Sequence, residues 1–474
     1  MRFVFSALYA TPLLLGCAAP LAQAVAANGA QPGVASQAPV VALASPGKPA
    51  SSRADSIAPL GYVEQEFILR GQARTYAKSG SWGADGHWGV APAGDGQAYT
   101  TRLLVRRPKD AAKFNGIVVV EWLNTTLGFD LDGAWALTRD ELTREGYAWV
   151  GVTTEASALD GLRKIDATRY ASSQIGHDDL SFDIFSQAGQ AVRQHGDALL
   201  GQTRPVKLLA AGYSKSAVFL NTYINAFQPD LKIYDGFFMH GRAPYAMSVA
   251  TKWWGAFSPP IRADLAAPVL QVQSEMEISV SWSLSKTPDT DKVRYWEVAG
   301  AAHFDQRVQE DTRAIAPPDY GSQPPPCLKP ISALPLYEVD NAALNALRQW
   351  VVAGTPPPKA ARMQRNALGF VKHDDQGHAL GGLRLPEIDV PVAGYGTYSN
   401  FASGSFSERN LFACVAGGST KPWPEAELRQ RYPSRDAYLN QYKAAADAAL
   451  AAGFLRPDDH AAALKRAQLT RMPW

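Results

Sequence analysis

Residues 205–217 read Pro-Val-Lys-Leu-Leu-Ala-Ala-Gly-Tyr-Ser-Lys-Ser-Ala and lead into an apolar stretch that ends near residue 224. The first half predicts a short buried strand, and the part that follows Ser214 predicts a helix. A serine at a sharp turn between strand and helix is the pattern of a nucleophile elbow, where small flanking residues let the two elements approach closely. Gly212 meets this need, and Ser216 stands where a second glycine is usual. The pattern predicts Ser214 as a catalytic nucleophile.

Eight strand-like stretches precede and follow this turn, and helix-like stretches separate most of them. Residues 117–122 are continuously apolar up to a final Glu-Trp, which is typical of a strand buried on both faces. Alternating strands and helices predict a mainly parallel sheet flanked by helices. Together with the serine turn, this arrangement leads us to expect the α/β-hydrolase fold. The predicted strands cover residues 62–69, 99–106, 117–122, 147–153, 206–211, 234–240, 269–273 and 293–298.

Two segments of the predicted hydrolase domain, residues 60–474, depart from this alternation. Residues 242–264 form an insertion rich in aromatic side chains, which either covers the serine as a lid or packs on the outside of the sheet. Residues 356–474 mix loops with helix-like stretches at 424–431 and 434–452. This C-terminal extension is predicted to wrap the main domain rather than fold alone.

A serine hydroxyl needs an adjacent base to become a good nucleophile, and the base needs an acid to orient it. In this architecture the three residues follow one another along the chain in the order serine, acid, histidine. His303 follows the last predicted strand in a loop of small residues and fits that order. His240 precedes every candidate acid, whereas His373 and His378 lie in a polar turn, read as a solvated turn rather than a metal loop. The order predicts His303 as the catalytic base.

The acid is expected where the strand at 269–273 ends, in the sequence Ser274-Glu275-Met276-Glu277. In this architecture the acid commonly comes three residues after a glycine at the strand end, and Ser274 takes the place of that glycine. This spacing favours Glu277, with Glu275 as the reserve acid. The carboxylate would hold the imidazole in one tautomer and stabilise its protonated form.

A tetrahedral oxyanion needs two preorganised donors. One predicted donor is the backbone N–H of Lys215, the residue after the nucleophile. The other is expected from the loop after residue 122, where Asn124 is favoured with a register uncertain by one residue. The Lys215 side chain either faces solvent or favours anionic substrates.

Composition excludes several classes of function. A net charge of +2 over 474 residues predicts no electrostatic attraction to nucleic acid or anionic membranes. The Cys and His spacing does not resemble a zinc site, and acyl transfer to serine needs no cofactor. Beyond the N-terminal apolar run, no stretch is apolar enough to predict a transmembrane helix.

The N-terminus predicts export. Residues 1–24 read as a signal peptide, and an alternative cleavage after residue 16 would leave Cys17 as a lipidated N-terminus. Residues 25–58 are poor in large apolar groups and are predicted to be a disordered leader. The sequence therefore predicts a secreted or periplasmic protein, with a lipoprotein as the alternative.

Either cleavage leaves Cys327 and Cys414 as the remaining cysteines outside the leader. An even pair in an oxidising compartment favours one disulfide, although two separate buried thiols are the alternative.

These motifs resemble a family of large secreted α/β hydrolases, most of which are known only as alpha/beta hydrolase domain proteins. The resemblance covers about residues 60–474 and rests on the elbow and on stretches at 120–124, 146–152, 182–191, 272–277, 299–303, 379–386 and 452–455. It implies that Ser214 and His303 occupy the catalytic positions and that Glu277 or Glu275 is the acid. The family's elbow usually has Gln after the nucleophile and Ser two positions on, so Ser216 fits and Lys215 departs.

The function expected from this reading is a secreted serine hydrolase that cleaves small carboxylic esters through an acyl-enzyme. A serine peptidase with the same triad and a non-catalytic cell-envelope binding protein on a hydrolase scaffold are the alternatives.

Overall fold

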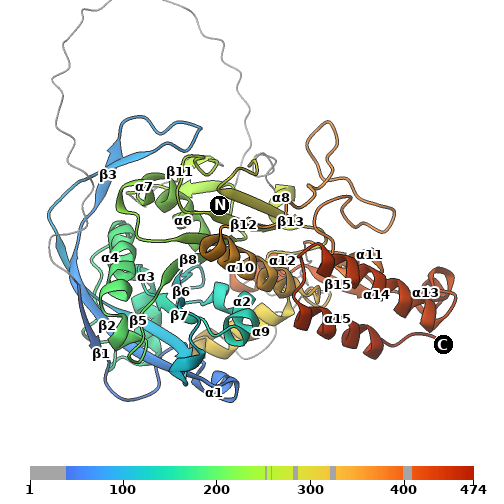
Figure 1. Ribbon diagram of the computed structural model, residues 1–474, viewed down its shortest axis with the longest axis horizontal. Coiled ribbons are helices and arrows are strands. Elements are labelled where there is room, and N and C mark those ends of the chain that lie inside the picture. The colour runs from blue at the N-terminus through green and yellow to red at the C-terminus, as the bar shows by residue number, and fades with distance from the viewer. Residues whose placement is uncertain (1–38, 251–253, 258, 281–286, 321–326, 399–407) are drawn as a thin grey trace, which may run out of the picture. The chain divides into compact units, whose positions relative to one another are not determined.

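One large sheet forms the centre of the structure, with nine strands in the order β1-β2-β5-β7-β6-β8-β9-β12-β13 (Figure 1). The strands from β7 to β13 in this order run parallel, whereas β1, β2, β5 and β7 pair antiparallel. The computed structural model describes residues 39–250, 254–257, 259–280, 287–320, 327–398 and 408–474. The strands span Val40–Leu43 (β1), Tyr62–Ala73 (β2), Gln97–Pro108 (β5), Ile117–Trp122 (β6), Ala148–Val152 (β7), Lys207–Tyr213 (β8), Gly236–His240 (β9), Val269–Ser274 (β12) and Val293–Val298 (β13).

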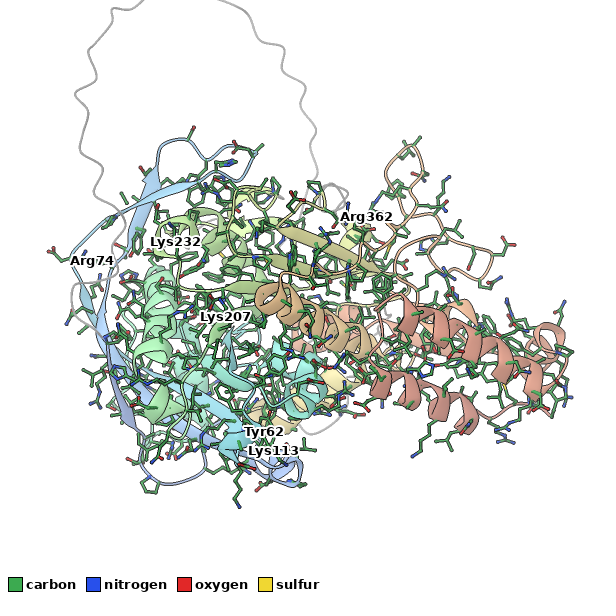
Figure 2. The ribbon with its side chains drawn as sticks, viewed as in Figure 1. Tyr62, Arg74, Lys113, Lys207, Lys232 and Arg362 are labelled. Carbon is green, nitrogen blue, oxygen red and sulfur yellow. A yellow bond between two sulfur atoms is a disulfide. The ribbon has the colours of Figure 1, made fainter. Side chains whose placement is uncertain are left out.

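Helices cover both faces of this sheet. Neighbouring residues of β6 point to opposite sides, so Val118 joins the hydrophobic cluster that contains Phe219 of α6, and Val119 joins the cluster that contains Trp135 of α2. Side chains fill both layers (Figure 2). The helices span Ala54–Ile57 (α1), Gly133–Arg144 (α2), Ala156–Ile165 (α3), Ser181–Gln194 (α4), Gly196–Leu199 (α5), Lys215–Ala226 (α6), Gln228–Leu231 (α7), Glu275–Val280 (α8), Gln306–Ile315 (α9), Leu336–Ala353 (α10), Pro386–Asp389 (α11), Glu408–Ala416 (α12), Glu425–Arg431 (α13), Arg435–Ala451 (α14) and Pro457–Leu469 (α15).

All eight predicted strands are present, and the prediction of a mainly parallel α/β-hydrolase sheet is confirmed. The ninth strand, β1, comes from the segment that was expected to be a disordered leader. It pairs antiparallel with β2, from Val40 opposite Arg70 to Leu43 opposite Phe67. The predicted sheet was therefore one strand too small.

The prediction of disorder for residues 25–58 is wrong over residues 39–58. Arg53 in this segment is 5% exposed, and it donates to Asp132 at 2.7 and 2.8 Å and to Asp311 at 3.4 Å. Composition did not reveal this order because backbone pairing and buried ion pairs, rather than apolar area, hold the segment. Residues 1–38, including the predicted signal peptide and Cys17, lie outside the described residues.

The insertion at 242–264 contains a two-stranded sheet of β10 (Tyr245–Met247) and β11 (Trp254–Phe257). It packs against α6, where the Thr222 hydroxyl donates to the Met247 carbonyl at 2.6 Å and the Asn225 amide donates to the Pro260 carbonyl at 2.8 Å. Residues 251–253 and 258 lie outside the described residues, so the lid remains a prediction. Two further hairpins pair β3 (Tyr76–Ser79) with β4 (Gly89–Pro92) and β14 (Ala393–Gly396) with β15 (Ser419–Pro422).

Ion pairs join the C-terminal extension to helices of the hydrolase core. Arg466 of α15 donates to Glu338 of α10 at 2.8 and 3.1 Å, and Asp459 accepts from Arg144 of α2 at 2.8 Å. The predicted helices at 424–431 and 434–452 correspond to α13 and α14, and α15 is an additional helix.

Cys327 and Cys414 form a disulfide that closes a loop of 87 positions. Cys414 lies in α12, so the bond ties the extension to the segment that follows α9. The chain-entropy model predicts a stabilisation of up to about 4–5 kcal/mol for a loop of this length.

Candidate active site

Ser214 stands at a strained turn between β8 and α6. Its backbone has φ 58° and ψ −119°, a region that residues with a side chain rarely adopt, and such a conformation costs about 1–3 kcal/mol. The Ser214 N–H donates to the carbonyl of His240 at the end of β9, at 2.9 Å. Neighbouring strands therefore hold the turn in place, as a nucleophile elbow requires.

The two small residues of the elbow have different roles. A Cβ atom at Gly212 would lie 2.8 Å from the Leu220 side chain and 2.9 Å from the Ser216 backbone, so the close approach of α6 requires glycine there. The Ser216 hydroxyl donates to the Tyr213 carbonyl at 2.8 Å and accepts from the Tyr213 N–H at 3.0 Å. Ser216 therefore closes the turn with hydrogen bonds that a glycine could not make.

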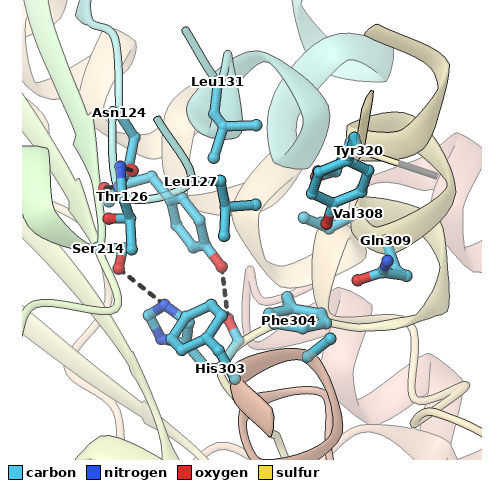
Figure 3. A pocket seen from close by; sticks show the side chains of 14 residues that line it. Asn124, Thr126, Leu127, Leu131, Ser214, His303, Phe304, Val308, Gln309 and Tyr320 are labelled. Carbon is cyan, nitrogen blue, oxygen red and sulfur yellow. Dashed lines mark hydrogen bonds between the residues drawn. The ribbon is translucent and has the colours of Figure 1, made fainter. Parts of the chain in front are cut away.

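The structure brings the predicted nucleophile, base and acid into one hydrogen-bonded chain. Ser214 Oγ lies 2.9 Å from His303 Nε2, a contact that a dashed line marks in Figure 3, and His303 Nδ1 lies 2.6 Å from Glu277 Oε1. The other Glu277 oxygen accepts from the Ser274 N–H at 2.8 Å and from its hydroxyl at 2.6 Å. The serine hydroxyl can thus donate to an imidazole whose opposite N–H is directed at a carboxylate.

The Glu277 carboxyl is buried, which by itself would raise its pKa. The charge and hydrogen bond of His303, together with the Ser274 hydroxyl, outweigh burial and hold the pKa of Glu277 below its ordinary value of 4.5. An acid with a lowered pKa stays ionised at neutral pH. It can therefore stabilise positive charge on the His303 ring.

Glu275, the reserve acid, makes different contacts. Its carboxylate accepts from the Gly300 N–H at 2.7 Å and lies 2.7 Å from His373 Nε2. The hydrogen bond to Glu275 raises the pKa of His373 above its ordinary value. Glu275 therefore ties the start of α8 to the C-terminal extension and does not contact His303 by any hydrogen bond in the described structure.

The other candidate histidines also have partners away from Ser214. His240 is fully buried, with Nδ1 2.8 Å from Asp340 of α10. The His378 ring lies beside Tyr395 and Trp423 of the extension.

The oxyanion donors require one correction. Asn124 is the second donor that the sequence favours, with a register uncertain by one residue, and its N–H already donates to the Leu131 carbonyl at 2.9 Å. Its side-chain amide donates to the Tyr213 carbonyl at 2.8 Å and supports the elbow instead. In the described part of the chain, the N–H groups of Lys215 and Thr125 have no hydrogen-bond partner. The sequence could not reveal this one-residue difference because it depends on the pairing of Asn124 with Leu131.

The Lys215 side chain does not simply face solvent. Its ammonium group donates to the Thr125 hydroxyl at 2.8 Å and forms a short ion pair with Glu155, whose side chain is buried. Burial raises the pKa of Glu155, and the charge of Lys215 partly offsets that rise. Lys215, the residue next to Ser214 that departs from the resembled family, thus neutralises a buried acid.

Two chambers open on Ser214 and His303. The narrow chamber, of about 40 Å³, is mostly apolar, and Figure 3 shows Leu127, Leu131 and Val308 facing into it. The wide chamber, of about 740 Å³, has Lys215 and Asp178 on its wall together with Met247. Phe412 of α12 lines both chambers, so the C-terminal extension contributes directly to the site.

The described helices include none that is both long and apolar enough to span a bilayer. Within the same residues, no three His, Cys, Asp or Glu side chains gather as a metal site would require.

The sheet topology and this elbow geometry define an α/β hydrolase. The family model described as "Alpha/beta hydrolase domain" matches residues 30–465, and the chain belongs to this family. The match begins within the segment that was predicted to be a disordered leader.

Several solved structures resemble the chain at low identity. A fungal esterase from Rhizomucor miehei is 13% identical, with 60% of this chain and 85% of that chain covered and a TM-score of 0.32. A serine hydrolase without lid from Xanthomonas campestris is 12% identical, with 48% and 92% covered and a TM-score of 0.29. Oligopeptidase B from Trypanosoma brucei is 13% identical, with 50% and 33% covered and a TM-score of 0.29. No curated protein matches the chain.

Replacing Lys215 by Met is expected to lower the free energy of unfolding by about 1–3 kcal/mol, because Glu155 would remain buried without its cation. Urea denaturation at neutral pH measures this loss. The matched control combines Lys215→Met with Glu155→Gln, and part of the stability should return because the buried charge is gone. Strictly additive losses in the double variant would contradict the coupling.

Proposed function

We propose that this protein is a serine hydrolase that cleaves carboxylic esters through an acyl-enzyme, with Ser214 as nucleophile, His303 as base and Glu277 as acid. The observation that carries the proposal is the hydrogen-bonded chain from Ser214 Oγ through His303 to Glu277, with the serine at a positive φ. A strained backbone that presents a serine to an imidazole has a clear use in acyl transfer.

In the first half-reaction, Ser214 Oγ attacks the ester carbonyl carbon while its proton passes to His303 Nε2. The tetrahedral intermediate collapses with cleavage of the carbon–oxygen bond, and Nε2 returns the proton to the departing alkoxide. In the second half-reaction, water attacks the acyl-enzyme, again with His303 as base and then as acid. Glu277 remains ionised throughout and stabilises the imidazolium.

The N–H groups of Lys215 and Thr125 are the proposed oxyanion donors. Lys215 is the first residue of α6, so its N–H belongs to the unpaired first turn of the helix. Both residues line the wide chamber together with Ser214, and neither N–H is engaged within the described structure. Donors held in place before the reaction stabilise the developing negative charge without reorganisation.

The two unequal chambers support an ester with unequal halves. The narrow chamber would accept a short apolar group, and the wide chamber would accept a larger group with polar substituents. Since Ser214 and His303 line both chambers, a substrate that spans them would place its scissile bond at the nucleophile.

Export is proposed as well. The Cys327–Cys414 disulfide supports residence in an oxidising compartment. A signal peptide at residues 1–24, or lipidation at Cys17, would deliver the protein there; the mass of the mature N-terminus distinguishes these two routes.

A fluorophosphonate probe is expected to label the folded protein once, because it reacts with an activated serine. Ser214→Ala should abolish both labelling and hydrolysis of p-nitrophenyl esters, whereas Ser216→Ala should still be labelled. Mass spectrometry of the labelled peptide measures the outcome. A folded protein that resists labelling would favour the non-catalytic alternative, and hydrolysis of peptides but not esters would favour the peptidase.

Glu277→Gln is expected to lower kcat by about 10²–10⁴-fold, because a neutral amide cannot stabilise the imidazolium. Glu275→Gln makes the same chemical change two residues earlier and should cost less than about tenfold in kcat, since Glu275 contacts Gly300 and His373. Steady-state kinetics, with melting temperatures to verify folding, decide between them. A larger loss in Glu275→Gln would overturn the assignment.

The rate of ester hydrolysis should depend on the length of only one half of the substrate, either the acyl group or the alcohol. Two substrate series, one with growing acyl chains and one with growing alcohols, are expected to show a sharp limit in one series and tolerance in the other. Leu131→Ala should relax the limited series by about tenfold in kcat/KM for one or two added methylenes, because it enlarges the narrow chamber. Met247→Ala, in the wide chamber, is the matched control, and an equal effect there would contradict the assignment of the chambers.

A further inference from the structure

Arg242 is a buried guanidinium without an acceptor for its charged end. It lies two residues beyond the end of β9 and is 1% exposed. Nε donates to the amide oxygen of Gln271 at 3.2 Å, whereas Nη1 and Nη2 are buried and have no hydrogen-bond partner among the residues that the structure describes. Four N–H bonds of a charged group are thus removed from water with nothing to receive them.

Two neighbouring side chains also offer hydrogen atoms without acceptors. Gln271 of β12 and Tyr295 of β13 are direct partners in the parallel ladder, and both are fully buried. In the described part of the chain, the amide nitrogen of Gln271 and the hydroxyl of Tyr295 have no hydrogen-bond partner. Three side chains around the same strand pair therefore present unused donors.

Two other buried arginines of this chain have carboxylate partners. Arg102 lies 2.8 Å from Asp130 and 3.2 Å from Glu66, and Arg106 lies 2.6 Å from Asp132. Arg242 has no carboxylate within ion-pair distance among the described residues. Arg294 is also buried and has no carboxylate partner among the described residues, but its guanidinium donates to the carbonyls of Pro357 at 2.9 Å and Thr290 at 2.6 Å. Arg242 differs because neither Nη1 nor Nη2 has an acceptor within the described structure.

The nearest acidic residue along β13, Glu297, pairs with another arginine, although its Oε1 accepts no hydrogen bond within the described structure. Glu297 lies two residues beyond Tyr295 on the same face of the strand, accepts from the Met363 N–H at 2.7 Å and lies 3.6 Å from Arg362, which Figure 2 labels. Burial lowers the pKa of Arg242 to about 10, so the guanidinium still carries its charge at neutral pH. A buried charge is costly unless a counter-charge accompanies it.

We propose that Arg242, Gln271 and Tyr295 form a binding site for one small inorganic anion of the halide type. An anion supplies both the acceptor for the unused donors and the missing negative charge, whereas a water molecule would supply only the acceptor. The ligand must be small, because Arg242 is almost fully buried and lines neither chamber of the candidate active site.

The proposed anion site adjoins the candidate active site through the turn at Gly241. Gly241, the preceding residue, lines the wide chamber with φ +60°, and a Cβ atom there would lie 3.0 Å from Cε1 of His303. The Arg242 backbone is clamped by Gln273, which accepts from its N–H at 2.7 Å and donates to its carbonyl at 2.8 Å. The bound anion would hold the turn that borders the imidazole, and this role does not depend on the proposed ester hydrolysis.

Bromide tests the site directly. In crystals of the full protein grown in sodium bromide, an anomalous peak is expected within hydrogen-bond distance of Arg242 Nη1 or Nη2. An ordered water, or no density, at that position would overturn the proposal.

Melting curves test the same site in solution. Replacing gluconate by chloride at constant ionic strength should raise the melting temperature by about 1–3 °C in a saturable manner. Arg242→Met should abolish this dependence, and Arg163→Met, which removes a partly exposed arginine, should preserve it. Tyr295→Phe removes one donor and should weaken the halide response if Arg242→Met does not fold. A chloride response that is absent in the native protein, or that survives both substitutions, would contradict the site.

Discussion

The backbone turn at Ser214 is the constraint on which the candidate site depends. Its positive φ costs about 1–3 kcal/mol, so the surrounding structure has to hold it. Three separate elements do so: the His240 carbonyl of β9, the Ser216 hydroxyl of α6 and the Asn124 amide from the loop after β6. Because these contacts set the position of the serine Oγ, they also set its distance to His303.

Segments outside the central sheet also contribute to the candidate site. Glu275, the first residue of α8, contacts His373 of the extension. The disulfide secures α12, whose Phe412 lines both chambers. At the other end of the chain, Arg53 joins the loop that carries Asp132 to Asp311 of α9. Both helix α9 and that loop contribute walls to the narrow chamber. The N-terminal and C-terminal segments therefore help to shape the chambers of the candidate site.

Local patterns predicted much of this architecture because their physical cause is local. Continuous apolar runs mark strands buried on both faces, and the small residues around Ser214 mark a turn where strand and helix meet. The order of serine, acid and histidine follows from the winding of a parallel sheet. Errors arose where a contact outside the strand or turn itself decides the outcome. Pairing with β2 orders residues 40–43 despite their composition. The Asn124 N–H donates to Leu131, so within the described structure the N–H without a partner is that of Thr125.

The sequence by itself determined the α/β-hydrolase class and the strands that carry the candidate site. It also determined the candidates for nucleophile, base and acid. Periodicity and turn chemistry suffice for this because they act over a few residues. Only the tertiary structure decided which of two neighbouring glutamates meets His303, what Lys215 pairs with and how two chambers divide the space around Ser214. Glu275 and Glu277 differ by two positions in a short helix, and the direction of each side chain depends on whether His303 or His373 is brought against it. Those encounters join residues about 26 and 98 positions apart, a distance over which local pattern carries no information.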